Sequence, residues 1–271
     1  RVRSSAASDV YKRQVFTREL VMPAMTEQQL LYNLPYEFRD YLTEEKSKYF
    51  FDYSMREVLW DESGQPTEMD LLACATLKST VESYRTMLRR AGFRLRVLTP
   101  SECAYSAVLQ AYYRRTQQEG HDLCVVNLGH SATFLYIYRG GHFASRREIE
   151  VGVSDLEHLV ADQCSVDVHV AHEYVRQNYN HVLESEQARE LYGRIAVEVV
   201  KAVNFFNYNN RERELTQLCL CGGGSAIQPL YDTIADTTGM TLHTSAELLG
   251  QRMSTEEPWL CLLYTSPSPR D

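Results

Sequence analysis

Apolar residues recur every fourth position after Thr26, at Leu30, Leu34, Phe38 and Leu42. This spacing predicts a helix with one apolar face over residues 26–48. Thr26 and Gln29 have the spacing of a capping box, in which two side chains satisfy backbone N–H groups at a helix start. Pro35 lies inside the predicted helix. Because proline removes a backbone donor and clashes with the preceding turn, we expect it to kink the helix or end it early.

Two strands, a second helix and a third strand are predicted next. Residues 49–60 and 69–76 are rich in aromatic and apolar residues, and the turn-forming sequence ESGQP separates them. An amphipathic helical pattern covers residues 78–91 and stops at Gly92. Residues 93–98 (FRLRVL) alternate apolar and polar positions, which predicts a strand with one solvated face. Together these elements, over residues 26–98, predict a compact α+β unit.

The second half of the chain, from Pro100 onward, predicts a different order of helices and strands. A helix is predicted from Pro100 to about Arg115, and the polar turn at 117–122 is a candidate domain boundary. Strands are predicted at 123–129, 132–139 and 142–151, with Gly140-Gly141 as a hairpin turn. Helical patterns follow at 154–164, 167–178 and 184–207. A strand at 215–221 leads through glycines into a helix, and a short strand covers 240–244.

The two ends, residues 1–14 and 262–271, carry no helical or strand period. They resemble translated vector or adapter sequence, so we expect them to be non-native tails and exclude them from the fold. Anything encoded upstream of Val15 would then be missing.

Composition narrows the class of protein. The chain has 271 residues with 44% hydrophobic and 24% charged residues, which is typical of a globular protein. Its formal charge of −8 argues against a nucleic-acid-binding surface, which should be basic. The seven cysteines are scattered, mostly in apolar runs, as in reduced intracellular proteins.

The strongest local motif is the run from Cys221 through Gly222, Gly223 and Gly224 to Ser225. Glycines let the main chain pass close to a ligand, and the N–H groups of a following helix suit a phosphate or a sugar edge. The run is neither a Walker P-loop nor the dinucleotide pattern G-x-G-x-x-G. A strained strand-to-helix turn without a ligand explains the run equally well.

A second motif joins two apolar strands. Residues 127–133 (NLGHSAT) form a tight turn with small and hydroxyl residues, whose N–H and hydroxyl groups can hold phosphate oxygens. An ordinary hairpin is the simpler interpretation of this motif alone.

The two motifs together are more specific than either one. A strand with N-x-G-x-S-x-T, a return strand and a hairpin, followed about 90 residues later by a strand and three glycines, resembles the second half of the actin-like ATPase fold. FTRELVMPAMTEQQLLYNLPYEFRDYL, LLACATLKSTVESYRTMLRRAGF and REIEVGVSDL resemble the PilM family of type IV pilus assembly, and more weakly FtsA of cell division. The resemblance covers about residues 15–250.

The resemblance implies an α/β fold of actin-like (ribonuclease H-like) lobes. Residues 15–99 would be an inserted α+β subdomain for partner binding, 100–120 the remainder of the first lobe, and 121–261 the second, nucleotide-binding lobe. The family's first strands would be missing.

It also implies roles for single residues in binding ATP and Mg²⁺. The candidate nucleotide-binding residues are Asn127, Gly129, Ser131 and Thr133 in the second phosphate loop, Lys201 near the base, and Gly222, Gly223, Gly224 and Ser225 in the adenosine motif.

The implied partner is the cytoplasmic tail of a PilN-like inner-membrane protein. The chain would be cytoplasmic and peripheral at the inner membrane through that partner. The resemblance also allows the chain to form a homo-oligomer. The alternatives are an FtsA-like division protein and an actin-fold kinase.

Two departures from the family pattern matter. The opening phosphate hairpin is absent, and Asn127 stands where relatives commonly have an aspartate that holds Mg²⁺. We therefore expect weak ATP hydrolysis at most, and no catalytic or metal-ligating residue is assigned.

Two other groups receive simpler interpretations. His169 and His172 are assigned to a solvated helix face, since no ligands complete a zinc site. Cys219 and Cys221 should share one strand face and pack in the core.

Overall fold

The computed structural model describes residues 15–117, 120–211 and 214–250, and the predicted tails at 1–14 and 262–271 lie outside these residues. Two compact units divide the chain between Ala104 and Tyr105. This division falls within a helix, α4 (Ser101–Thr116), about five residues from the expected boundary at 99/100. We call the two parts the N-terminal unit and the C-terminal unit.

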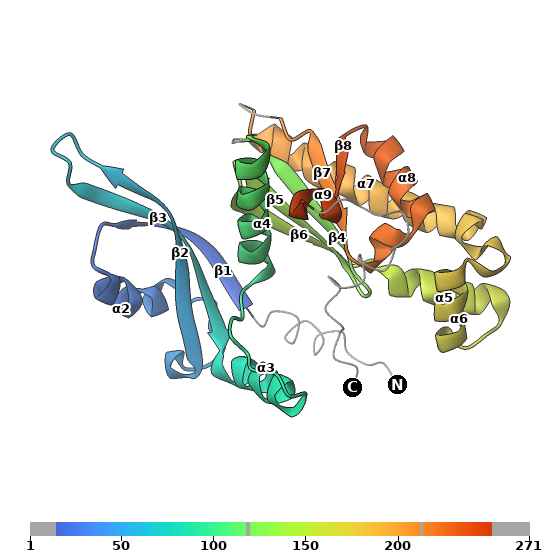
Figure 1. Cartoon of the computed structure of the whole chain (residues 1–271), viewed down its shortest axis with the longest axis horizontal. Coiled ribbons are helices and arrows are strands. Elements are labelled where there is room, and N and C mark those ends of the chain that lie inside the picture. Colours follow the sequence, from blue (N-terminus) through green and yellow to red (C-terminus); the bar gives the residue numbers. More distant parts are fainter. Residues whose placement is uncertain (1–14, 118–119, 212–213, 251–271) are drawn as a thin grey trace. The chain divides into compact units, whose positions relative to one another are not determined.

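The N-terminal unit is a three-stranded antiparallel sheet with helix α2 packed on it (Figure 1). Its strand order is β1-β3-β2. The bounds are β1 Val15–Pro23, α2 Glu27–Glu37, the short 3₁₀ helix Lys46–Lys48, β2 Tyr49–Trp60, β3 Pro66–Leu77 and α3 Lys78–Arg90. Leu30, Leu34 and Phe38 are buried against β1 and β3, as the four-residue spacing predicts.

Helix α2 begins and ends as its sequence predicts. Thr26 and Gln29 form the capping box, with the Gln29 amide N–H donating to the Thr26 hydroxyl. The helix ends at Glu37, two residues beyond Pro35, rather than at residue 48.

Two expectations for this unit are wrong. Residues 93–98 form no strand, and Phe93 and Val97 are 68% and 76% exposed. Strand β1, for which no element was predicted, pairs instead with β3 along its whole length. Alternation of apolar and polar residues indicates which side of a strand is buried, but it does not indicate whether another strand is available for pairing. Strand β1 has such a partner in β3.

The C-terminal unit is built on a five-stranded mixed sheet of order β6-β5-β4-β7-β8. The strands are β4 Leu123–Leu128, β5 Thr133–Arg139, β6 His142–Ile149, β7 Gln217–Cys221 and β8 Thr241–Thr244. The helices are α5 Val153–Cys164, α6 Val168–Gln177, α7 Glu186–Asn209, α8 Gln228–Thr238 and α9 Ser245–Leu249, with 3₁₀ turns at Tyr179–Glu184 and Gly223–Ala226.

Helices cover both faces of this sheet (Figure 1). Even-numbered positions of β4, such as Val126 and Leu128, share one core with the apolar face of α7 and with α8. The part of α4 that begins at Tyr105 packs on the opposite face. The centroid of the Tyr105 ring lies 5.2 Å from that of Tyr136 on β5. The strands predicted at 123–129, 132–139, 142–151, 215–221 and 240–244 therefore lie in one sheet.

Candidate functional site

The two glycine-containing motifs lie side by side at the ends of two neighbouring strands. Strands β4 and β7 are parallel, and Asn127 is opposite Cys221 in their register. Both strands end there, so residues 127–133 (the first bend) and 222–225 (the second bend) leave the sheet at the same edge. In open α/β sheets, ligands bind at the carboxyl ends of parallel strands.

The backbones of the two bends touch, and glycine is required for this contact. Gly222 has φ +83°, and a Cβ there would collide with the Asn127 side-chain oxygen and lie 2.6 Å from the Leu128 carbonyl oxygen. A Cβ on Gly224 would lie 2.8 Å from the Cβ of Leu128. The Asn127 side chain therefore lies between the bends.

The first turn of helix α5 forms backbone hydrogen bonds with the first bend. The amide of Val153 donates to the Gly129 carbonyl at 3.0 Å, and the amide of Ser154 donates to the His130 carbonyl at 2.8 Å. A Cβ on Gly152 would collide with the His130 carbonyl. The loop is thus fixed to the first turn of α5.

His130 and Ser131 lie exposed at the tip of the first bend. Among the described residues, neither backbone N–H has a backbone acceptor. Two consecutive free N–H groups on an exposed turn are the donors that anion-binding loops use.

The hydroxyl groups of Thr133 and Ser225 form hydrogen bonds within the protein. Thr133 is fully buried, and its hydroxyl donates to the Val151 carbonyl at 2.9 Å. The Ser225 hydroxyl donates to the Gly222 carbonyl at 2.7 Å. Both bonds shape their bends from inside.

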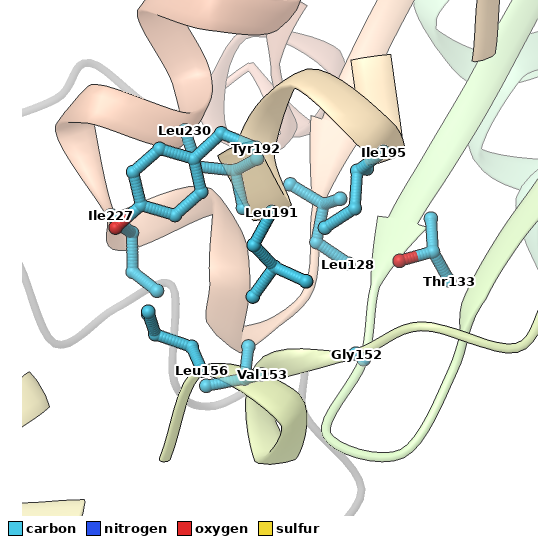
Figure 2. Close-up of a pocket in the computed structure, with 11 residues that line it drawn as sticks. Leu128, Thr133, Gly152, Val153, Leu156, Leu191, Tyr192, Ile195, Ile227 and Leu230 are labelled. Atoms are coloured by element: carbon cyan, nitrogen blue, oxygen red, sulfur yellow. The ribbon is translucent and has the colours of Figure 1, made fainter. Parts of the chain in front are cut away.

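A small cavity lies beneath the first bend. It has a volume of about 10 Å³ and is lined by apolar side chains of α5, α7 and α8, including Leu156, Leu191 and Ile195 (Figure 2). This space holds one water molecule at most. The cavity therefore belongs to the core, and a phosphate ligand would lie on the exposed side of the bends.

Lys201 is the one candidate residue that is not at the bends. Ile195 of α7 lines the cavity with Leu128 and Thr133, and Lys201 is six residues further along, about 9 Å up the helix axis. Its ammonium lies 2.7 Å from Glu198 Oε1, and this hydrogen bond lowers the pKa of Glu198.

A half-buried tyrosine, Tyr105, and two buried thiols adjoin the second bend. Cys219 and Cys221 are both buried, as predicted, and the Tyr105 hydroxyl lies 3.5 Å from Cys221 Sγ. Burial, and to a smaller extent the neighbouring Cys221, raises the pKa of Tyr105 well above its ordinary range. The Tyr105 hydroxyl therefore stays protonated, and the two thiols pack in the core.

A group that the sequence analysis missed adjoins the first bend. Glu157 on α5 is 4% exposed, and its Oε1 lies 2.8 Å from His172 Nδ1 and 3.9 Å from His130 Nδ1. His172 therefore contacts a buried carboxylate rather than solvent alone. The sequence contains a clue, because Glu157 has the helical spacing of the buried Val160 and Ala161.

The described residues fit Mg²⁺ poorly. Asn127 brings no negative charge, and within these residues no group of three His, Cys, Asp or Glu side chains is arranged to hold a metal ion. Mg²⁺ usually binds through carboxylates together with phosphates of its substrate. A bound Mg²⁺ would here be held mainly by the phosphates.

Comparison with known proteins identifies the family. The sequence pattern of the type IV pilus assembly protein PilM matches residues 2–256, nearly the whole chain. The chain belongs to this family. The predicted family resemblance is therefore confirmed, and so is the assignment to type IV pilus assembly.

A solved structure shares the fold. A chain of the PilM-PilN type IV pilus biogenesis complex superposes with a TM-score of 0.69 and 19% sequence identity, covering 92% of this chain and 68% of that chain. The predicted fold class is confirmed by this match.

Weaker likenesses are also found. The archaeal actin homologue Ta0583 gives a TM-score of 0.42 at 16% identity, covering 58% of this chain and 56% of that chain. The ethanolamine utilization protein EutJ from Carboxydothermus hydrogenoformans gives 0.40 at 15%, covering 52% and 50%. No curated protein matches the sequence. Within the described ranges, no helix is long and apolar enough to cross a membrane.

Proposed function

We propose that this chain is a nucleotide-binding scaffold of type IV pilus assembly that holds ATP at the two bends. The contact of Gly222 with Asn127 and Leu128 is the observation that carries this proposal. This contact joins the glycine turn to the bend that carries the free N–H groups of His130 and Ser131, which supports one surface for a phosphate chain and its ribose. Gly129, Ser131, Gly223 and Ser225 complete that surface, and Thr133 shapes it.

The scaffold would hydrolyse ATP weakly at most. Phosphoryl transfer depends on metal ions that neutralise charge on the phosphates. Asn127 supplies no carboxylate to fix Mg²⁺, which would enter with the nucleotide. ATP then acts mainly as a ligand that stabilises one conformation.

Residues 15–99 would bind the cytoplasmic tail of a PilN-like inner-membrane protein. The solved relative is a complex of PilM with PilN. The N-terminal unit exposes large apolar side chains, including Tyr32 on α2 and Val97, which suit a protein partner. The chain would be cytoplasmic and peripheral at the inner membrane through this partner.

Calorimetric titration of the full chain with ATP tests the nucleotide site. We expect saturable binding that Ser131→Glu weakens at least tenfold, because the new carboxylate repels the phosphates at an exposed position. Ser79→Glu, the same change on exposed helix α3, should leave the affinity unchanged. Absence of ATP binding, or rapid turnover of a sugar substrate, would contradict the proposal.

A pull-down tests the partner. The immobilised cytoplasmic tail of the pilus PilN protein should retain the full chain, and a tail with scrambled sequence should not. Equal retention by both tails would rule out specific binding.

A further inference from the structure

The group of His130, Glu157 and His172 joins the first bend to helices α5 and α6. Glu157 is almost completely buried, whereas the side chains of His130 and His172 are 59% and 45% exposed. A buried carboxylate is costly unless cationic or hydrogen-bond donor groups surround it. The two imidazoles are such groups, and one of them belongs to the first bend.

His130 is held at two points. Its carbonyl oxygen accepts the amide of Ser154 at 2.8 Å, and its Nδ1 lies 3.9 Å from the Glu157 carboxylate. Nε2 has no hydrogen-bond partner among the described residues, and more than half of the side chain is exposed. The imidazole is therefore oriented by the protein on one edge and open on the other.

The chemistry of imidazole decides what the open edge can do. With Nδ1–H directed at a carboxylate, Nε2 donates a hydrogen bond only when the ring is an imidazolium. An imidazolium at this position is attracted to the Glu157 carboxylate 3.9 Å away, and its Nε2–H can donate a charge-assisted hydrogen bond to an anion on the exposed side. A phosphate oxygen at the tip of the bend would receive this bond together with the N–H groups of His130 and Ser131.

The same bend lacks the negative group that would hold a metal. Asn127 is neutral and offers no carboxylate to bind Mg²⁺, so this loop cannot gain positive charge from a metal ion held by the protein. His130 is the group in this loop that can provide positive charge from the protein itself.

We propose that His130, positioned by the buried carboxylate of Glu157, is a phosphate-binding residue that contacts the polyphosphate chain of the ligand directly. This inference rests on the proposed nucleotide site and names a residue within it. Glu157 is a positioning residue that acts through His130.

Titration calorimetry of the full chain with ATP, and separately with inorganic tripolyphosphate, tests the proposal. His130→Gln should weaken binding of both anions by about tenfold, because one charge-assisted hydrogen bond is lost. His181→Gln is the matched control: His181 lies 3.9 Å from Glu184, is 86% exposed and is remote from the bends in sequence. It should leave both affinities within twofold.

The outcomes separate the two levels of the proposal. If the unaltered chain binds neither anion, the nucleotide site itself fails and this inference fails with it. If the unaltered chain binds ATP and His130→Gln binds it equally well, only the role of His130 is overturned. Weakening for ATP but not for bound tripolyphosphate would also overturn it, because His130 would then contact another part of the nucleotide.

Glu157→Gln tests the positioning role while preserving the size of the side chain. Imidazole ¹⁵N spectra of the full chain should show that the His130 Nε2 resonance moves when ATP is added. In Glu157→Gln this resonance should differ before ATP is added, and the affinity should fall by about threefold to tenfold. A change in melting temperature with an unaltered His130 resonance and affinity would assign Glu157 a structural role only and overturn the positioning claim.

Discussion

Gly222 is the residue on which the contact between the two bends depends. Its φ of +83° is unfavourable for other residues, and a Cβ would also meet the backbone of Leu128. Gly239 likewise has a positive φ (+62°), but a Cβ there has nothing within 4 Å. Substitutions at Gly222 and Gly239 therefore distinguish the cost of backbone strain, which both share, from the cost of close packing, which applies only to Gly222.

We predict that Gly222→Ala lowers the free energy of unfolding by about 3 kcal/mol or more, since strain and overpacking add. Gly239→Ala should lower it by about 1 kcal/mol, because only the backbone conformation is strained. Urea unfolding of both variants measures the difference. Equal losses would show that the bends do not pack as closely as described.

Cys74 gives the N-terminal unit a dependence on alkaline pH. Burial, with a smaller contribution from the neighbouring Cys103, raises the pKa of the Cys74 thiol to about 11. The folded protein therefore keeps a proton that the unfolded chain releases near pH 9, so ionisation favours unfolding. This contribution to stability is complete below about pH 9 and is lost as the pH rises toward 11.

The prediction is a decline in the free energy of unfolding between about pH 9 and 11 that is shallower in Cys74→Ala. Urea unfolding at a series of pH values measures both slopes. Parallel curves for the two proteins would show that the Cys74 thiol does not contribute.

Single residues of the candidate site were predictable only in part. Gly222 and Gly224 stand out in the sequence because three consecutive glycines after an apolar strand are unusual. Glu157 does not stand out, because its importance comes from His130 and His172, which the fold brings to it. Helical spacing shows that Glu157 faces inward, but it cannot show which side chain it meets.

At the scale of elements, local sequence accounts for helix α2. Thr26 and Gln29 form the capping box at its start, and its apolar face is buried. Removing the Thr26 hydroxyl leaves backbone donors at the helix start without an acceptor.

Thr26→Ala should therefore lower the free energy of unfolding by about 1 kcal/mol. Thr26→Ser keeps the hydroxyl and should cost only a few tenths of a kcal/mol. Chemical denaturation compares the two. A similar loss in both variants would indicate that the cap contributes little to this helix.

The two errors in the strand prediction arise because a strand is stabilised by a neighbour that is distant in the sequence. The hairpin strands β5 and β6 were predicted, since Gly140-Gly141 joins them directly. Strand β1 was missed, and the strand expected at 93–98 is absent from the described structure. No local pattern shows that β1 pairs with β3, whose partner residues lie 45 to 61 positions later in the sequence.

The whole molecule consists of two units, each with its own buried core. Separate cores unfold as separate cooperative transitions when few interactions couple them. The overall α/β class was predictable, because the order of elements and the two bends are features of the sequence.

We predict two transitions in differential scanning calorimetry. Thr26→Ala should shift only the transition of the N-terminal unit, and Gly222→Ala only that of the C-terminal unit, because each substitution alters one core. A single transition that moves in both variants would show that the units unfold together.

The parallel pairing of β4 with β7 has a consequence for synthesis on the ribosome. The first bend emerges with the β4–β5 hairpin, but its partner strand is encoded about 90 residues later. At about 5–20 residues per second, the second bend follows roughly 5–20 s afterwards. A nascent chain that stops before Gln217 therefore carries only one bend of the proposed nucleotide site, and the second bend is added once translation has passed the three glycines.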